Sequence, residues 1–157
     1  MSSFQPPSLA LDGTTFSIGV VAARYNPALV EVLLADVLAG LYAAGVKQKK
    51  ITVVRVPGSH EVPFAAQALV AARRCDGVIA LGVLLAGDTK HHEMVGQSVS
   101  HALQLVSLAT RTPVINGVIV ADTLAQARAR CIGKAARGGE FARAALEMVA
   151  LKRKLSS

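Results

Sequence analysis

The residues best suited to chemistry in this chain stand together in the segment GDTKHH, at positions 87–92. Gly87, Asp88 and Thr89 follow an apolar run and come directly before a stretch with helical spacing. The start of a helix presents unpaired backbone N–H groups and the positive end of its dipole, so this turn can bind an anion such as phosphate. Asp88 or Thr89 can equally serve as the helix N-cap, and the two roles are compatible.

Two adjacent histidines, His91 and His92, occupy the first turn of that expected helix. Successive helical positions point about 100° apart, so at most one of the two faces a site at the turn. His91 is the candidate proton carrier, although adjacent histidines are often only a surface pair. A metal site is not expected, because neighbouring positions on one helix cannot chelate one ion and no third ligand has suitable spacing.

Polar residues also follow two earlier apolar runs, in RYNP (24–27) and PGSHE (57–61). Asn26 precedes a proline, as an N-cap residue often does, and Tyr25 offers either a stacking face or a buried core ring. Glu61 can complement the dipole of the helix that follows it, or it can orient a polar ligand.

Short β-rich apolar runs alternate along the chain with longer stretches whose apolar residues recur at helical spacing. The apolar runs are residues 17–23, 51–56, 77–83 and 113–120, and the helical stretches are residues 27–45, 62–74, 91–111, 123–131 and 141–155. This alternation predicts right-handed crossovers and a parallel sheet covered on both faces. We therefore expect an α/β protein, a flavodoxin-like three-layer α/β/α sandwich with a four-stranded parallel sheet. Ligands of such sheets bind beyond the carboxyl ends of the strands. The loops at those ends are residues 24–26, 57–61, 84–92 and the helix start after 118–123.

Length and composition limit the classes of protein that the chain can be. At 157 residues we expect a single domain over residues 1–157, with residues 1–14 as an extended N-terminal segment. Hydrophobic residues make up 52% and charged residues 17%, which excludes a disordered protein and favours burial of apolar surface between subunits.

No apolar run reaches the roughly 18 residues of a membrane span, and the N-terminus has no apolar signal core. A cytoplasmic protein without a membrane partner is expected.

The formal net charge of +7 would suit a nucleic-acid binder, but it would equally attract anionic metabolites. The basic residues stand in scattered groups without interleaved aromatic residues, which favours a solvated surface over a nucleic-acid interface. Cys75 and Cys131 have no ligand-like spacing, so we expect reduced structural thiols.

Five segments match a known family in order and spacing, from about residue 12 to residue 152. They are RYN, VPGSHEVP, GVLLAGDTKHHEMV, GVIVADTLAQARAR and AALEM. Together they resemble the lumazine synthases, enzymes of riboflavin biosynthesis. The resemblance implies a condensation of 5-amino-6-ribitylaminouracil with 3,4-dihydroxy-2-butanone 4-phosphate, without a metal or cofactor. The products are 6,7-dimethyl-8-ribityllumazine, phosphate and water, and much of the acceleration in such enzymes is attributed to holding both substrates together.

The resemblance also implies roles for particular residues. His91 matches the proton-transfer histidine of the family, Gly87 to Thr89 match its phosphate-binding turn, and Arg130 matches the arginine that pairs with phosphate. Tyr25 would stack on the pyrimidine. The residues implied around the ring and the ribityl chain are Asn26, Ser59, His60, Glu61, Leu84, Leu85 and Asn116.

The family also implies a shared site and a particular assembly. Arg130 and the residue at position 116 come from the neighbouring subunit of a homopentamer, and some members close twelve pentamers into a shell of 60 subunits. An extra N-terminal strand can pass between neighbours. The short run RCIGKAARGGE (130–140) permits such a shell without requiring it.

The chain departs from the family pattern near the implied site. Ala86 replaces a common Arg, His60, His92 and Asn116 replace aromatic or apolar residues, and Gly138 replaces a usual Lys. Fewer cations weaken the field on the phosphate and ribityl groups, which Lys134 and Arg137 can partly restore. The loss of aromatic stacking surface at His60 and Asn116 lowers substrate affinity. The alternative is therefore a catalytically weakened homologue that binds lumazine or flavin, or forms shells. Generic nucleotide binding is less well supported, because ARYNPA follows the first strand where a Gly-rich fingerprint would stand.

Overall fold

A computed structural model of the chain describes residues 9–133 and 136–156. The strands are β1 (Ile18–Ala23), β2 (Ile51–Val56), β3 (Gly77–Leu85) and β4 (Val114–Ala121). The helices are α1 (Pro27–Ala43), α2 (Val62–Arg73), α3 (His91–Thr110), α4 (Leu124–Cys131) and α5 (Gly138–Ser156), with 3₁₀ helices η1 (Gln48–Lys50) and η2 (Ser59–Glu61). The alternation of strand and helix expected from the sequence is confirmed.

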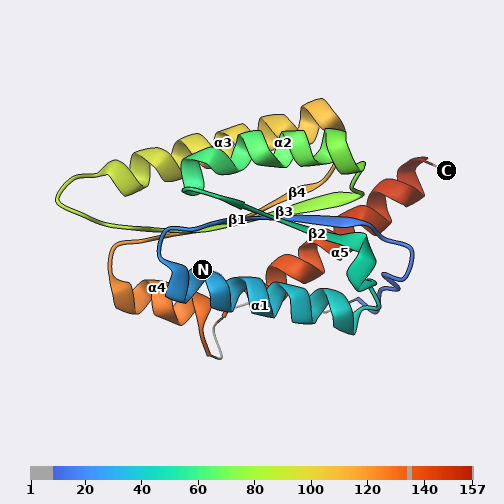
Figure 1. The fold of residues 1–157 in the computed structure, drawn as a ribbon, viewed down its shortest axis with the longest axis horizontal. Helices are drawn as coiled ribbons and strands as arrows, with labels where there is room; N and C mark the ends of the chain where they lie inside the picture. The colour runs from blue at the N-terminus through green and yellow to red at the C-terminus, as the bar shows by residue number, and fades with distance from the viewer. Residues whose placement is uncertain (1–8, 134–135, 157) are drawn as a thin grey trace.

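The sheet is parallel throughout, with the strand order β2-β1-β3-β4. Helices α2 and α3 cover one face, and α1, α4 and α5 cover the other (Figure 1). The three-layer flavodoxin-like fold is therefore confirmed. Residues 9–14 of the expected N-terminal extension form no strand, and the rest of that segment lies outside the described residues.

Strand β1 shows how one apolar run fills both layers of the core. Ile18, Val20 and Ala22 pack with residues of α1, α4 and α5, whereas Val21 and Ala23 pack with residues of α2 and α3. Successive side chains of a strand point to opposite faces of the sheet, so a strand covered on both faces must be apolar at every position. All six residues of β1 are buried, as this requirement predicts.

The strand order reverses direction at β1, which pairs with β2 on one side and with β3 on the other. The connecting helices α1 and α2 lie on opposite faces of the sheet (Figure 1). At such a reversal a crevice opens beyond the carboxyl ends of the two central strands, and it is the usual ligand site of this architecture. The crevice between β1 and β3 is therefore the first place to look for a functional site.

Two further expectations concern the cysteines and the membrane. Cys75 and Cys131 are buried and unpaired, as the sequence predicts. Burial raises the pKa of both thiols, that of Cys131 to about 11. Among the described helices, none is both long and apolar enough to cross a membrane.

Candidate active site

A cleft of about 530 Å³ opens at the carboxyl ends of the central strands. These strand ends lie to the left in Figure 1. Its walls come from the loop after β1, the η2 turn after β2, the end of β3 and the first turns of α3. Most of the site residues implied by the resemblance line it. They are Tyr25, Asn26, Ser59, His60, Glu61, Leu84, Leu85 and His91.

Tyr25 and Glu61 meet over a glycine at one wall of the cleft. The Glu61 Oε2 atom accepts a hydrogen bond from the backbone N of Gly58 at 2.9 Å. A Cβ atom on Gly58 would lie 3.2 Å from both Tyr25 Cδ2 and Glu61 Oε2, so the absence of a side chain there lets both approach. The Tyr25 side chain is 71% exposed, which excludes a core tyrosine and leaves the ring available for stacking.

Asn26 and Ser59 connect the first two loops to β3. Asn26 stands at the N-cap position of α1, as expected, but its side chain makes no capping bond. Its Nδ2 atom instead donates to the carbonyl oxygen of Val83 at 2.8 Å. Ser59 is buried, and a Cβ atom on Gly82 would lie 2.4 Å from its Oγ atom, so Gly82 makes room for the η2 turn.

His91 is the first residue of α3, and its exposed side chain lines the cleft. The preceding turn, residues 87–89, is exposed and follows the cleft wall without lining it. As a cap the turn is weak: Thr89 Oγ1 accepts from His91 N at a long 3.4 Å, and Lys90 at the N-cap position makes no side-chain capping bond. The backbone N of Glu93 donates to the carbonyl oxygen of Lys90 at 3.1 Å, but no capping side chain competes strongly with an anion for the N–H groups of His91 and His92.

His92 points away from the cleft that its neighbour lines. It is 6% exposed, and its Nε2 atom lies 3.0 Å from Oδ1 of Asp122, the residue after β4. The prediction that at most one of the two histidines faces the site is confirmed. Sequence reasoning missed Asp122 as the partner of His92.

The first turn of α3 also brings three ligand-type side chains together. One ligand atom each of His92, Glu93 and Asp122 lies within 4.8 Å of the others. The spacing of ligands along the sequence could not reveal this cluster, because the fold brings Asp122, at the end of β4, beside α3.

Two implied residues lie outside the cleft of their own chain. Arg130, on α4, donates from Nη1 to the carbonyl oxygen of Val120 at 3.0 Å. Asn116 is exposed on the edge strand β4, and its Oδ1 atom accepts from the backbone N of Val118. Neither residue lines the cleft. Their arrival from a neighbouring subunit stays a prediction.

Of the two basic residues expected to substitute for the missing cations, the structure describes only one. Lys134, the expected substitute cation, lies outside the described residues. The Arg137 Nε atom donates to Glu140 Oε2 at 2.5 Å, and the Arg137 guanidinium lies over the ring of Phe141. Arg137 is therefore bound to α5, and its charge is partly compensated there.

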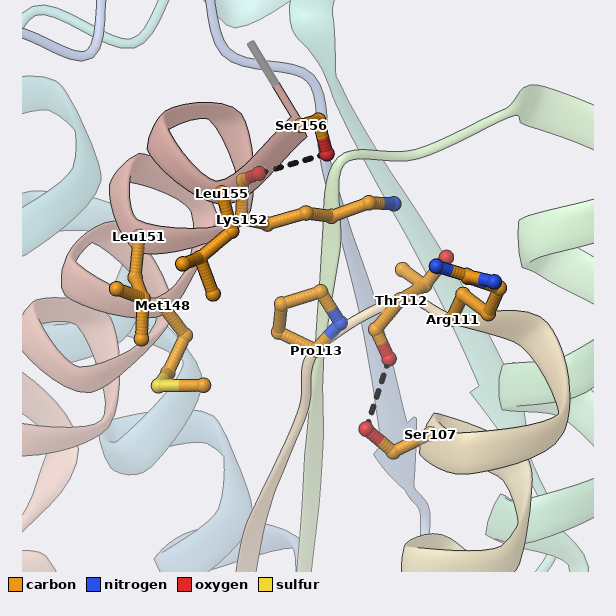
Figure 2. A pocket seen from close by; sticks show the side chains of 9 residues that line it. All are labelled: Ser107, Arg111, Thr112, Pro113, Met148, Leu151, Lys152, Leu155 and Ser156. Carbon is orange, nitrogen blue, oxygen red and sulfur yellow. Dashed lines mark hydrogen bonds between the residues drawn. The ribbon is translucent and has the colours of Figure 1, made fainter.

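A second hollow of about 310 Å³ lies at the opposite edge of the sheet, between the end of α3, the start of β4 and the last turns of α5 (Figure 2). Apolar Met148, Leu151 and Leu155 form much of its lining, and Arg111 and Lys152 add positive charge. None of the implied site residues lies there, and the amino ends of parallel strands are not the usual place for a ligand.

Comparison with known proteins agrees with the motifs. The family model described as 6,7-dimethyl-8-ribityllumazine synthase matches residues 15–153. Proteins of that name from Thermobifida fusca, Paracidovorax citrulli and Aquifex aeolicus are 44%, 42% and 42% identical to this chain. The alignments cover 99%, 93% and 94% of this chain and 91%, 93% and 95% of those proteins. With a match of this extent, and with the family's motifs gathered around one cleft, the chain belongs to the 6,7-dimethyl-8-ribityllumazine synthase family.

Proposed function

We propose that this chain condenses 5-amino-6-ribitylaminouracil with 3,4-dihydroxy-2-butanone 4-phosphate in the cleft between β1 and β3, as a transferase of riboflavin biosynthesis. The observation that carries the proposal is the cleft itself, which gathers Tyr25, Glu61 and His91 from segments that follow three different strands. A parallel sheet collects reactive groups in this way only at its carboxyl edge.

The pyrimidine side of the cleft is held in place before any substrate arrives. The Asn26 amide is bonded to the carbonyl oxygen of Val83, and the Glu61 carboxylate is bonded to the backbone N of Gly58. Side chains that are already ordered lose less conformational entropy on binding. The exposed ring of Tyr25 beside them supplies a flat apolar surface for the pyrimidine.

The condensation needs proton transfers at several points. The amine of the pyrimidine adds to the carbonyl carbon of the butanone, a C–N bond forms, and the carbonyl oxygen leaves as water. The C–O bond to phosphate then breaks, which leaves a second carbonyl after tautomerisation. The ribitylamino nitrogen adds to that carbonyl and closes the new ring, with loss of a second water. His91, at the edge of the cleft, can accept a proton from the amine and return it to a leaving oxygen. The remaining acceleration comes from holding both substrates side by side.

The phosphate would bind at the N-terminus of α3. The backbone of residues 87–89 and the start of this long helix offer N–H donors and a positive dipole end. An arginine at position 130, contributed by a neighbouring chain, would add the charge-assisted bonds that the turn lacks.

We also propose that the chain assembles as a homopentamer, and that the 60-subunit shell is a further state open to it. Exposed apolar side chains on α2 and α3 support self-association: Phe64 is 80% exposed, Leu105 53% and Leu108 75%. A surface of this kind is typical of a subunit interface. The cytoplasmic location stays a prediction, which fractionation of the cells that make the protein would check.

Turnover by the purified protein tests the proposed function. Both substrates are mixed with and without protein, and the absorbance of 6,7-dimethyl-8-ribityllumazine is followed with time. We expect product to form faster with protein at every substrate concentration. Equal rates with and without protein would refute the proposal.

A further inference from the structure

Three consecutive residues at the carboxyl end of β4 hold segments that the proposed function assigns to phosphate binding. The carbonyl oxygen of Val120 accepts from Arg130 Nη1 at 3.0 Å, and that of Ala121 accepts from the backbone N of Ala86 at 3.0 Å. Asp122 Oδ1 lies 3.0 Å from His92 Nε2. The loop between β3 and α3 is therefore attached to the end of β4 on both sides, at Ala86 and at His92.

The loop between these two attachments has little else to hold it. Residues 86–90 are all exposed, and Ala86 and Gly87 carry no polar side chain. Within the described part of the chain, no atom beyond the adjoining residues lies within 4 Å of the position that a Cβ on Gly87 would occupy. The hydrogen bond from His91 N to Thr89 Oγ1 is long, at 3.4 Å. The contact of His92 with Asp122 is therefore the polar attachment nearest to the start of α3, and the next attachment, the close packing of Gly96 on Val120, comes one turn later.

The surroundings of His92 indicate which of its nitrogen atoms carries a proton. A carboxylate oxygen accepts only, so Nε2 must carry the hydrogen that it donates to Asp122. His92 Nδ1 is buried, and no described group bonds to it. A proton on Nδ1 would be a buried donor without a partner, which is costly. The ring is therefore best satisfied as the Nε2–H form.

The same argument counts against a metal at His92, Glu93 and Asp122. A metal would need the lone pair of Nε2, and the proton would then move to the unpartnered Nδ1. Metal-binding histidines almost always donate their other ring nitrogen to an acceptor, and the described residues offer none here. The arrangement fits a hydrogen bond better than a metal site.

We propose that His92 and Asp122 are positioning residues of this enzyme. Their hydrogen bond fixes the first turn of α3 against the end of β4, and with it the His91 imidazole and the anion-binding turn at residues 87–89. This proposal rests on the proposed function of the cleft. In it His92 contacts no substrate and acts only through the position of His91 and the turn.

Replacing His92 with Phe is the central test. His92→Phe keeps a buried ring of similar size and removes both the donor to Asp122 and the unpartnered nitrogen. We expect the melting temperature to stay the same or rise, while kcat/KM for the butanone phosphate falls roughly tenfold to a hundredfold, as misplacement of reacting groups by about 1 Å can do. The KM for the pyrimidine substrate should not change, because its wall of the cleft is formed by other loops.

Matched variants separate positioning from simple structural damage. In His92→Gln the amide nitrogen can reach the place of Nε2, so activity should largely return, and in Asp122→Asn an acceptor oxygen remains, so activity should be kept. In kcat/KM, Asp122→Ala should behave like His92→Phe, although its melting temperature should be lower because the buried Nε2–H of His92 loses its acceptor. In kcat/KM the double variant His92→Phe/Asp122→Ala should be no worse than either, because both changes remove one interaction.

Hydrogen exchange reports on the attachment without any substrate. The amides of residues 87–93 should exchange faster in His92→Phe than in the parent, and at the parental rate in His92→Gln. An inactive parent would refute the proposed function, whereas this exchange pattern would still support the attachment. Parental kcat/KM and parental exchange in His92→Phe would overturn the proposal. A thermal shift with Zn²⁺ that His92→Phe abolishes would also overturn it, in favour of a metal site.

Discussion

Asn26 combines two properties that few residue types offer at the end of β1. Its backbone is left-handed, with φ 56° and ψ 56°, a conformation that Gly and Asn adopt more readily than other residues. Its side chain also reaches β3, where it donates to the carbonyl oxygen of Val83. One residue therefore turns the chain into α1 and holds the cleft wall after β1 against the strand beside it.

Substitution of Asn26 can separate these two contributions. Asn26→Gly keeps the left-handed backbone and loses the hydrogen bond, so the free energy of unfolding should fall by about 1 kcal/mol. Asn26→Ala loses both the hydrogen bond and the favourable left-handed backbone. Its free energy of unfolding should be about 1 kcal/mol lower than that of Asn26→Gly, a difference that already includes the greater freedom of Gly in the unfolded chain. Urea denaturation of the three proteins measures this difference. Equal losses in both variants would show that the backbone conformation carries no strain.

Cys131 makes the free energy of unfolding depend on pH in the alkaline range. Burial raises the pKa of its thiol from 9.0 to about 11, so the unfolded chain ionises first as the pH rises. The stabilisation from the neutral buried thiol is complete below pH 9 and is lost as the pH rises toward 11. We expect the free energy of unfolding to fall across this range, and to fall less in Cys131→Ala. Urea titrations at several pH values test this, and identical pH profiles would contradict it.

At the scale of elements, the ends of β3 and α5 differ from the sequence prediction. Strand β3 continues to Leu85, two residues beyond the expected end, because it pairs with β4 as far as Leu85 and Ala121. Helix α5 begins at Gly138, three residues before the expected start, although two glycines open it. A Cβ atom on Gly138 would lie 2.5 Å from Asp36 Cβ, so this glycine lets α5 pack closely on α1. Tertiary packing outweighs the low helix propensity of glycine here.

The two adjacent glycines at the start of α5 allow a matched comparison. Gly138→Ala should lower the free energy of unfolding by about 1–2 kcal/mol, because overpacking costs more than the gain in helix propensity returns. Gly139→Ala should leave stability unchanged or raise it by up to about 1 kcal/mol, since the nearest atom to its Cβ position is Arg143 Nη1 at 3.7 Å. Thermal denaturation tests both. A loss in Gly139→Ala as large as that in Gly138→Ala would contradict the packing argument.

At the scale of the whole molecule, the sequence predicts which loops form the cleft, but it does not predict the hydrogen bonds that hold those loops in place. The loops at residues 24–26, 57–61 and 84–92 could be selected in advance, because a parallel sheet puts every carboxyl end at one edge. The bond between His92 and Asp122 could not, since it joins residues 30 positions apart and depends on how far β4 extends beside α3. Arg130 and Asn116 were predicted from the family pattern alone, and neither lines the cleft of its own chain.

The exposed apolar surface of α2 and α3 supports the proposed self-association, and the number of five subunits is what the family resemblance implies. Sedimentation of the parent should show a pentamer or a multiple of five subunits. A double Glu substitution at Phe64 and Leu105 should give smaller species and lose turnover, because charges would be buried at the interface and the shared site would come apart. Leu155→Glu, at another exposed apolar position on α5, is the comparison and should assemble as the parent does. A monomer with full activity would exclude a shared site.

Turnover of His91→Ala tests the central claim most directly, with His101→Ala as the control. His101 is exposed on the same helix and does not line the cleft. If the cleft between β1 and β3 carries out the condensation, His91→Ala should lower kcat on the order of 100-fold, which is typical of a lost proton-transfer group. His101→Ala should keep the parental rate. A parental kcat in His91→Ala would contradict the assignment of proton transfer to this residue and to this cleft.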